Sequence, residues 1–157
     1  MISWMFIDSE ETLERYQELN TPLNPVLYPT SIFWDTQCIL GYYDSENQRG
    51  LFAHKLDSGE DERVKIDNLP FLLLCDKENL LEWKQFQHGD LTNAATRAFR
   101  IPTHRNGKYV YFGRLRLGNK HPIGQVCEYG ICYIPTLLNG VIRISDFEIL
   151  MYRDVRL

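Results

Sequence analysis

The stretch Asn106–Tyr152 decides the fold, because it contains a series of short apolar runs separated by turn residues. The series is Lys108-Tyr-Val-Tyr-Phe112, Ile123-Gly-Gln-Val126, Ile131-Cys-Tyr-Ile134, Val141-Ile-Arg-Ile144 and Asp146-Phe-Glu-Ile-Leu150. β-Branched and aromatic residues in runs of this length, bounded by turn residues, favour β-strands. The stretch therefore predicts several neighbouring antiparallel strands.

A fainter copy of this series lies about 80 residues earlier in the chain. The matched pairs are Trp4 with Trp83, Ile32–Trp34 with Val110–Phe112, Ile39–Gly41 with Pro122–Gly124, Gly50–Ala53 with Gly130–Tyr133, Arg63–Ile66 with Val141–Ile144, and Phe71–Leu74 with Phe147–Leu150. Their common order and nearly constant spacing predict an internal duplication. We expect two repeats, residues 1–79 and 80–157, that pack together as one compact unit with approximate two-fold symmetry.

The clearest helix signal covers residues 9–19. Asp8 or Ser9 can cap the N-terminus of this helix, and Glu11 can complete a capping box. Pro22 is expected to end the helix. From residue 28 onward, short strand-like runs alternate with turn residues. We expect an all-β, sandwich-like fold made of two pseudo-symmetric antiparallel repeats, with one short N-terminal helix near residues 9–19.

The bulk composition indicates an ordinary globular protein of 157 residues, 44% of them hydrophobic. The N-terminus has no basic flank before its short apolar patch, so we expect a cytoplasmic protein, with leaderless secretion as the alternative. The four cysteines contain no Cys-x-x-Cys pair. We interpret Cys127 and Cys132 as reduced thiols on half-buried strands. The alternative is a weak metal site that these two cysteines form with His104 and His121. We expect no metal and no cofactor.

Charge is distributed unequally between the two halves. Residues 1–79 contain 6 basic and 15 acidic residues, which gives a net charge of −9. Residues 80–157 contain 11 basic and 6 acidic residues, which gives a net charge of +5. One interpretation is an acidic repeat packed beside a basic one, and the opposite charges would also allow head-to-tail homo-oligomers. Another is a patch for a phosphate-bearing ligand or a lipid headgroup. Its candidate residues are Arg100, Arg105, Arg116 and Lys120.

Two classes of function are not favoured by the sequence. The chain has no Gly-rich phosphate loop, no Gly-x-Ser-x-Gly and no His-Glu-x-x-His motif, so we expect it not to be an enzyme. Nucleic acid is not expected as a partner, because the whole chain is acidic and contains no recognisable DNA-binding or RNA-binding module.

Several motifs in the second half follow one another in the order of a known repeat. They are Trp83, Gly89 with Asn93-Ala94, Asn106-Gly107, Tyr111-Phe-Gly-Arg-Leu115, Ile123-Gly-Gln-Val126 and Phe147-Glu-Ile-Leu150. In this order and spacing the chain resembles the DM-nine repeat, which occurs in tandem in invertebrate lectin-like proteins. The resemblance covers about 70 residues, and the first half fits only through its internal match to the second.

The resemblance implies a tandem all-β fold, innate recognition and carbohydrate binding, with mannose as the ligand of the characterised lectins. In that family an aspartate and a lysine hold the sugar hydroxyls. Here the aspartate position falls on His104 and the lysine position on Gln125, and in the first repeat the lysine position falls near Tyr42. We therefore predict an altered sugar site at His104, Arg105, Gln125 and Tyr42. A different register restores an acid and a lysine through Asp44 and Lys65 but breaks four matched segments. An interaction module without a sugar site is the alternative function.

Overall fold

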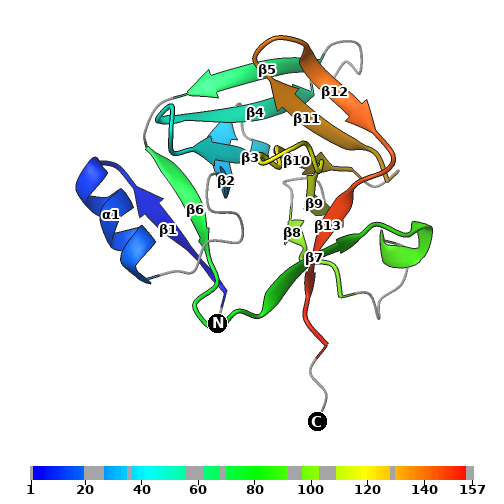
Figure 1. The fold of residues 1–157 in the computed structure, drawn as a ribbon, viewed down its shortest axis with the longest axis horizontal. Helices are drawn as coiled ribbons and strands as arrows, with labels where there is room; N and C mark the ends of the chain where they lie inside the picture. Colours follow the sequence, from blue (N-terminus) through cyan, green and yellow to red (C-terminus); the bar gives the residue numbers. More distant parts are fainter. Residues whose placement is uncertain are drawn as a thin grey trace.

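The protein is described by a computed structural model that covers residues 2–19, 27–34, 37–55, 62–67, 70–91, 97–102, 109–127 and 130–154. These residues form two antiparallel β-sheets and one short α-helix (Figure 1), which confirms the predicted all-β class. No helix in the described part of the chain has the length and apolar character needed to cross a membrane.

Each sheet is built from one continuous half of the chain. The first sheet contains β1 (Ser3–Ile7), β2 (Leu27–Trp34), β3 (Gln37–Asp44), β4 (Arg49–Lys55), β5 (Glu62–Asp67) and β6 (Phe71–Cys75), in the spatial order β1-β6-β2-β3-β4-β5. The second contains β7 (Leu81–Gln85), β9 (Tyr109–Arg114), β10 (Ile123–Val126), β11 (Cys132–Thr136), β12 (Gly140–Ile144) and β13 (Glu148–Tyr152), in the order β12-β11-β10-β9-β13-β7. The two-residue strand β8 (Ile101–Pro102) pairs with β9.

The two sheets share one connectivity, because β7, β9, β10, β11, β12 and β13 take the places of β1 to β6 in turn. The hydrogen-bonded partners agree at the outer strands: Trp4 lies opposite Leu74, and Trp83 lies opposite Leu150. The assignment of residues 1–79 and 80–157 as DM-nine-like repeats stays a prediction.

At β2 and β9 the strand pairing differs from the sequence match of Ile32–Trp34 with Val110–Phe112. Ser31 lies opposite Leu40 and Leu72, whereas Arg114 lies opposite Ile123 and Glu148. Ser31 and Arg114 are therefore the equivalent residues of the two sheets. Short apolar runs fit several registers by hydrophobicity alone, and only the cross-strand partners distinguish those registers.

The helix α1 (Glu10–Leu19) confirms the predicted helix, but its cap differs in detail. The Thr12 amide donates to Ser9 Oγ at 3.3 Å, and the Ser9 amide donates to Thr12 Oγ1 at 3.1 Å. Thr12 rather than Glu11 thus completes a reciprocal capping box, because a threonine hydroxyl three residues after the cap can also accept a hydrogen bond. The Tyr16 hydroxyl donates to the Leu74 carbonyl oxygen at 2.6 Å and holds the helix against β6.

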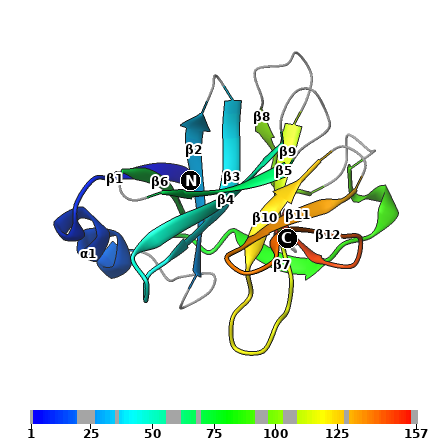
Figure 2. The same ribbon diagram turned by 90° about the horizontal axis from the view of Figure 1, so that it is seen from above.

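Three groups of buried side chains stabilise the fold. One lies within the first half and includes Tyr16 of the helix, and another lies within the second half around Phe147. The third contains residues from both halves, among them Leu40 and Phe112, and joins the two sheets. Figures 1 and 2 show the sheets meeting along β3, β4 and β5 of the first and β10, β11 and β12 of the second. Burial of this shared core is the main force that holds the halves together.

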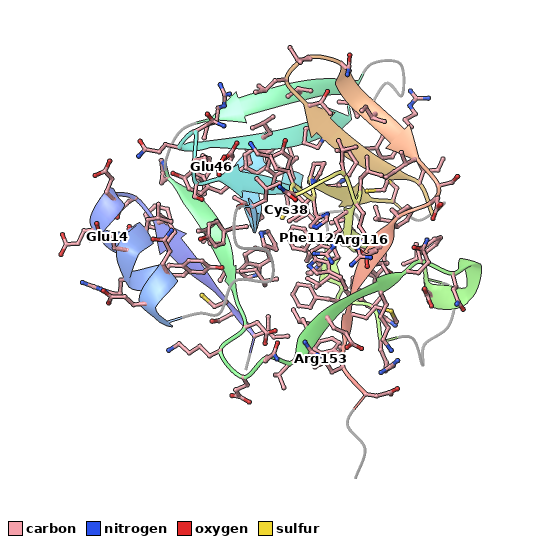
Figure 3. All side chains as sticks on the ribbon, in the orientation of Figure 1. Glu14, Cys38, Glu46, Phe112, Arg116 and Arg153 are labelled. Carbon is pink, nitrogen blue, oxygen red and sulfur yellow. The ribbon has the colours of Figure 1, made fainter. Side chains whose placement is uncertain are left out.

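A tight connection links β6 to β7, and thereby the two sheets. The buried carboxylate of Asp76 accepts hydrogen bonds from the amides of Leu80 at 2.7 Å and Leu81 at 2.9 Å. From the C-terminal end, Arg153 Nε donates to the Asn79 carbonyl oxygen at 2.9 Å. Figure 3 labels Arg153 in this region.

Asp76→Ala is expected to lower the free energy of unfolding by about 2 to 3 kcal/mol, because one buried and one part-buried amide lose a charged acceptor. Urea unfolding followed by tryptophan fluorescence measures the loss. Lys77→Ala, at an exposed position in the same turn, is the matched control and should change stability by less than about 0.5 kcal/mol. Equal effects of the two substitutions would contradict the role assigned to Asp76.

Candidate functional site

Two of the four predicted sugar-binding residues connect the sheets. Gln125 Oε1 accepts a hydrogen bond from the Leu40 amide at 3.0 Å, and the buried Tyr42 hydroxyl donates to the Pro135 carbonyl oxygen at 3.2 Å. These polar atoms therefore stabilise the contact between the halves. The other two predicted residues, His104 and Arg105, lie outside the described residues.

In the alternative register the acid is Asp44, and its carboxylate is already hydrogen-bonded within its own turn. Asp44 Oδ1 accepts hydrogen bonds from the amides of Glu46 at 3.0 Å and Asn47 at 3.3 Å, and Asp44 Oδ2 accepts one from the Asn47 side chain at 2.7 Å. Asp44 thus caps the turn between β3 and β4. The side chain of Lys65 lies outside the described residues.

Tyr42 provides a test of the contact between the sheets at alkaline pH. Burial raises the pKa of its hydroxyl to about 12, and Asp44 contributes to the increase. The unfolded chain loses this proton near pH 10 and the folded chain does not, so stability is complete below pH 10 and falls between pH 10 and 12. Tyr42 alone is expected to account for a loss of up to about 3 kcal/mol.

Urea unfolding at pH 9, 10.5 and 12 measures this loss, and Tyr42→Phe should reduce the pH dependence. An identical dependence in the variant would contradict the assignment.

Among the predicted anion-binding residues that the structure describes, Arg100 lies apart from Arg116. The Arg100 guanidinium lies 5.4 Å from the centre of the Tyr109 ring, Lys120 Nζ lies 3.3 Å from Glu46 Oε2, and Arg116 Nε lies 3.2 Å from Glu148 Oε1. Arg100 is close to the first residue of β9 and Arg116 follows the last, so they are separated by roughly 17 Å of strand. Arg105 lies outside the described residues.

The cysteines give no support to a metal site. Cys132 is fully buried, which raises the pKa of its thiol, and Cys127 is half-buried. In the described ranges, no three His, Cys, Asp or Glu side chains are arranged to hold a metal ion.

A cluster of charged and aromatic side chains lies where β9 ends, and we call it the Arg114 cluster. It consists of Trp83 of β7, Arg114 of β9, Arg116 and His121 of the β9–β10 hairpin, and Glu148 of β13. Arg114 Nε donates to Glu148 Oε1 at 2.9 Å, and the Arg114 guanidinium lies 4.8 Å from the centre of the Trp83 ring. Glu148 Oε1 is also close to Arg116 Nε. One carboxylate oxygen thus lies between two guanidinium groups.

The cluster has a buried part, formed by Arg114 and Glu148, and a solvent-accessible edge. The side chains of Arg114 and Glu148 are 11% and 14% exposed, whereas that of Arg116, labelled in Figure 3, is 72% exposed. Burial lowers the pKa of the Arg114 guanidinium, and the hydrogen bond to Glu148 opposes this change. Burial also lowers the pKa of His121, with further lowering by Arg114 and Arg116. A ligand that approaches from solvent would therefore meet Arg116 and His121 first and the buried pair beyond them.

Two polar atoms of the cluster are buried without a hydrogen-bond partner in the described part of the chain. They are Nε1 of Trp83 and Nδ1 of His121. A buried polar atom without a partner costs about 1 to 3 kcal/mol, so such atoms call for an explanation beyond folding. Water or a ligand that bonds to these two atoms would recover this cost.

The first sheet shows that the fold does not require this cluster. Ser31 and Leu72 occupy the positions that correspond to Arg114 and Glu148, and they lie opposite each other in the same pairing. Trp4 corresponds to Trp83. Burying an ion pair is costly compared with burying apolar side chains of similar size. At these equivalent positions the second sheet buries an ion pair and the first sheet does not. This difference favours a functional role for Arg114 and Glu148.

The sequence contained a signal for this cluster that we did not interpret as a site. Trp83, Arg114 and Glu148 belong to three of the motifs that carry the resemblance to the DM-nine repeat, and the structure brings them into contact. Comparisons with protein-family models, curated proteins and solved structures find no match to the chain.

Proposed function

We propose that this chain is a non-catalytic, lectin-like protein of the DM-nine kind that binds a carbohydrate at the Arg114 cluster. The observation that carries the proposal is the buried Arg114–Glu148 pair beside Trp83, which the equivalent positions of the first sheet lack. A carboxylate accepts hydrogen bonds from sugar hydroxyls while a guanidinium donates to them, and such charge-assisted bonds are strong. The pair thus offers the combination of acid and cation that His104 and Gln125 do not.

Calorimetric titration with D-mannose, supported by a glycan array, tests the proposal. We expect saturable binding at millimolar sugar or below, weakened about tenfold in Glu148→Gln, which keeps the size of the side chain and removes its charge. Arg15→Gln is the matched control, because Arg15 is an exposed cation of α1 far from the cluster in sequence. If no glycan binds while the circular dichroism spectrum shows folded protein, the proposal is wrong.

A second candidate is a protein-assembly module, which the opposite charges of the two halves favour. Lys120 and Glu46 show within one chain the kind of contact that would join two chains. Such contacts weaken as salt screens them. Sedimentation velocity at low and high salt tests this candidate, and a monomer at every salt and protein concentration would count against it.

A further inference from the structure

The Arg114 cluster has more positive charge than its own carboxylate neutralises. Two guanidiniums, Arg114 and Arg116, lie close to the single carboxylate of Glu148. Residues 91–127 contain no Asp or Glu, so the hairpin that holds Arg116 supplies no second acid. Lys120 of the same hairpin lies close to the carboxylate of Glu46, in the turn between β3 and β4, so its positive charge is already paired. The excess of one positive charge therefore lies at the two arginines.

Hydrogen-bonding groups show the same imbalance. A guanidinium has five N–H donors and no acceptor, and indole Nε1 only donates. Within the described residues, Arg114 uses its Nε towards Glu148, and its two Nη groups have no hydrogen-bonded acceptor. Trp83 Nε1 is likewise without an acceptor. The remaining carboxylate oxygen, Glu148 Oε2, is the one acidic acceptor left at the cluster, so free donors outnumber it.

We infer that the ligand of this site is a sugar that carries an oxyanion, such as the carboxylate of a uronic acid or a sugar phosphate. This inference rests on the proposed carbohydrate-binding function. The oxyanion would accept hydrogen bonds from Arg114 and Arg116, since a planar guanidinium can donate two parallel hydrogen bonds to a carboxylate or a phosphate. The sugar hydroxyls would donate to Glu148 Oε2. A neutral sugar would offer the arginine donors only uncharged hydroxyl oxygens, and it would leave the excess positive charge of the cluster without a counter-charge.

Calorimetry with D-mannose, D-mannuronate, D-mannose 6-phosphate and inorganic phosphate tests the inference. At least one of the two anionic sugars is expected to bind about tenfold or more tightly than D-mannose, since hydrogen bonds to charged groups are worth about 1.5 to 3 kcal/mol. The better of the two identifies the source of the oxyanion. Arg116→Gln should remove most of this preference for the anionic sugar over D-mannose, and Arg15→Gln should retain it.

The outcomes separate the inference from the proposed function. If D-mannose binds as tightly as both anionic sugars, the inference is overturned and the proposed function stands. If inorganic phosphate binds as tightly as D-mannose 6-phosphate, and Arg116→Gln abolishes both, the site recognises a free anion and the inference is also overturned. If none of the sugars binds to the folded protein, the proposed function fails, and the inference fails with it.

Discussion

Gly41→Ala and Gly124→Ala are each expected to destabilise the protein by more than about 4 kcal/mol. The two glycines lie at corresponding places of β3 and β10. A Cβ atom at Gly41 would collide with the carbonyl oxygen of Leu51, and one at Gly124 would collide with that of Tyr133. Both obstacles are backbone atoms of the neighbouring strand, which cannot move aside as the end of a side chain can. Since a domain of this size is stable by only about 5 to 15 kcal/mol, either substitution removes much of its stability.

Chemical denaturation of the purified variants measures these losses, and solubility during expression gives an earlier indication. Gly89→Ala is the matched control, because an added Cβ at Gly89 meets no atom within 4 Å. It should change stability by less than about 0.5 kcal/mol. A Gly124→Ala variant as stable as the control would show that β10 and β11 adjust freely, contrary to the close approach seen here.

Glu148→Leu is expected to cost about 3 to 5 kcal/mol, because it leaves the buried Arg114 guanidinium without its anion. Arg114→Ser should cost less, since Glu148 keeps the nearby Arg116. The double variant Arg114→Ser with Glu148→Leu reproduces the residues of the first sheet. It is expected to regain most of the stability that Glu148→Leu alone loses.

A double-mutant cycle of urea unfolding experiments gives the coupling energy of the pair. The exposed pair Arg15 and Glu11, one helical turn apart, supplies the control, with a coupling below about 0.5 kcal/mol. Strictly additive losses at Arg114 and Glu148 would mean that the second sheet cannot accept the residues of the first. The double variant also tests the proposed function, because it should remain folded and fail to bind sugar.

Much of the fold could be predicted from the sequence because its signals are local. Residues 9–19 combine a capping residue with apolar residues at helical spacing, and the strands coincide with short runs rich in aromatic and β-branched residues. The register of β2 against β9 could not be predicted. It depends on which cross-strand partners meet, and Ile32–Trp34 and Val110–Phe112 are equally apolar.

The candidate site was harder to predict because it depends on contacts between distant residues. Trp83 and Glu148 are far from Arg114 in sequence, and their proximity follows from the order β9-β13-β7. Gln125 and Tyr42 have the right chemistry for a sugar, and each forms a hydrogen bond to the opposite sheet. Nothing in their local sequence indicates that contact.

The construction of each sheet from one continuous half bears on how the chain could be divided. A cut between Asn79 and Leu80 would leave β1 to β6 on one piece and β7 to β13 on the other, so no ladder of strands would be interrupted. Each piece would, however, expose its part of the shared apolar core, including Leu40 on one side and Phe112 on the other. The two pieces would therefore act as each other's folding partner, and reassembly from separate fragments would depend on that common core.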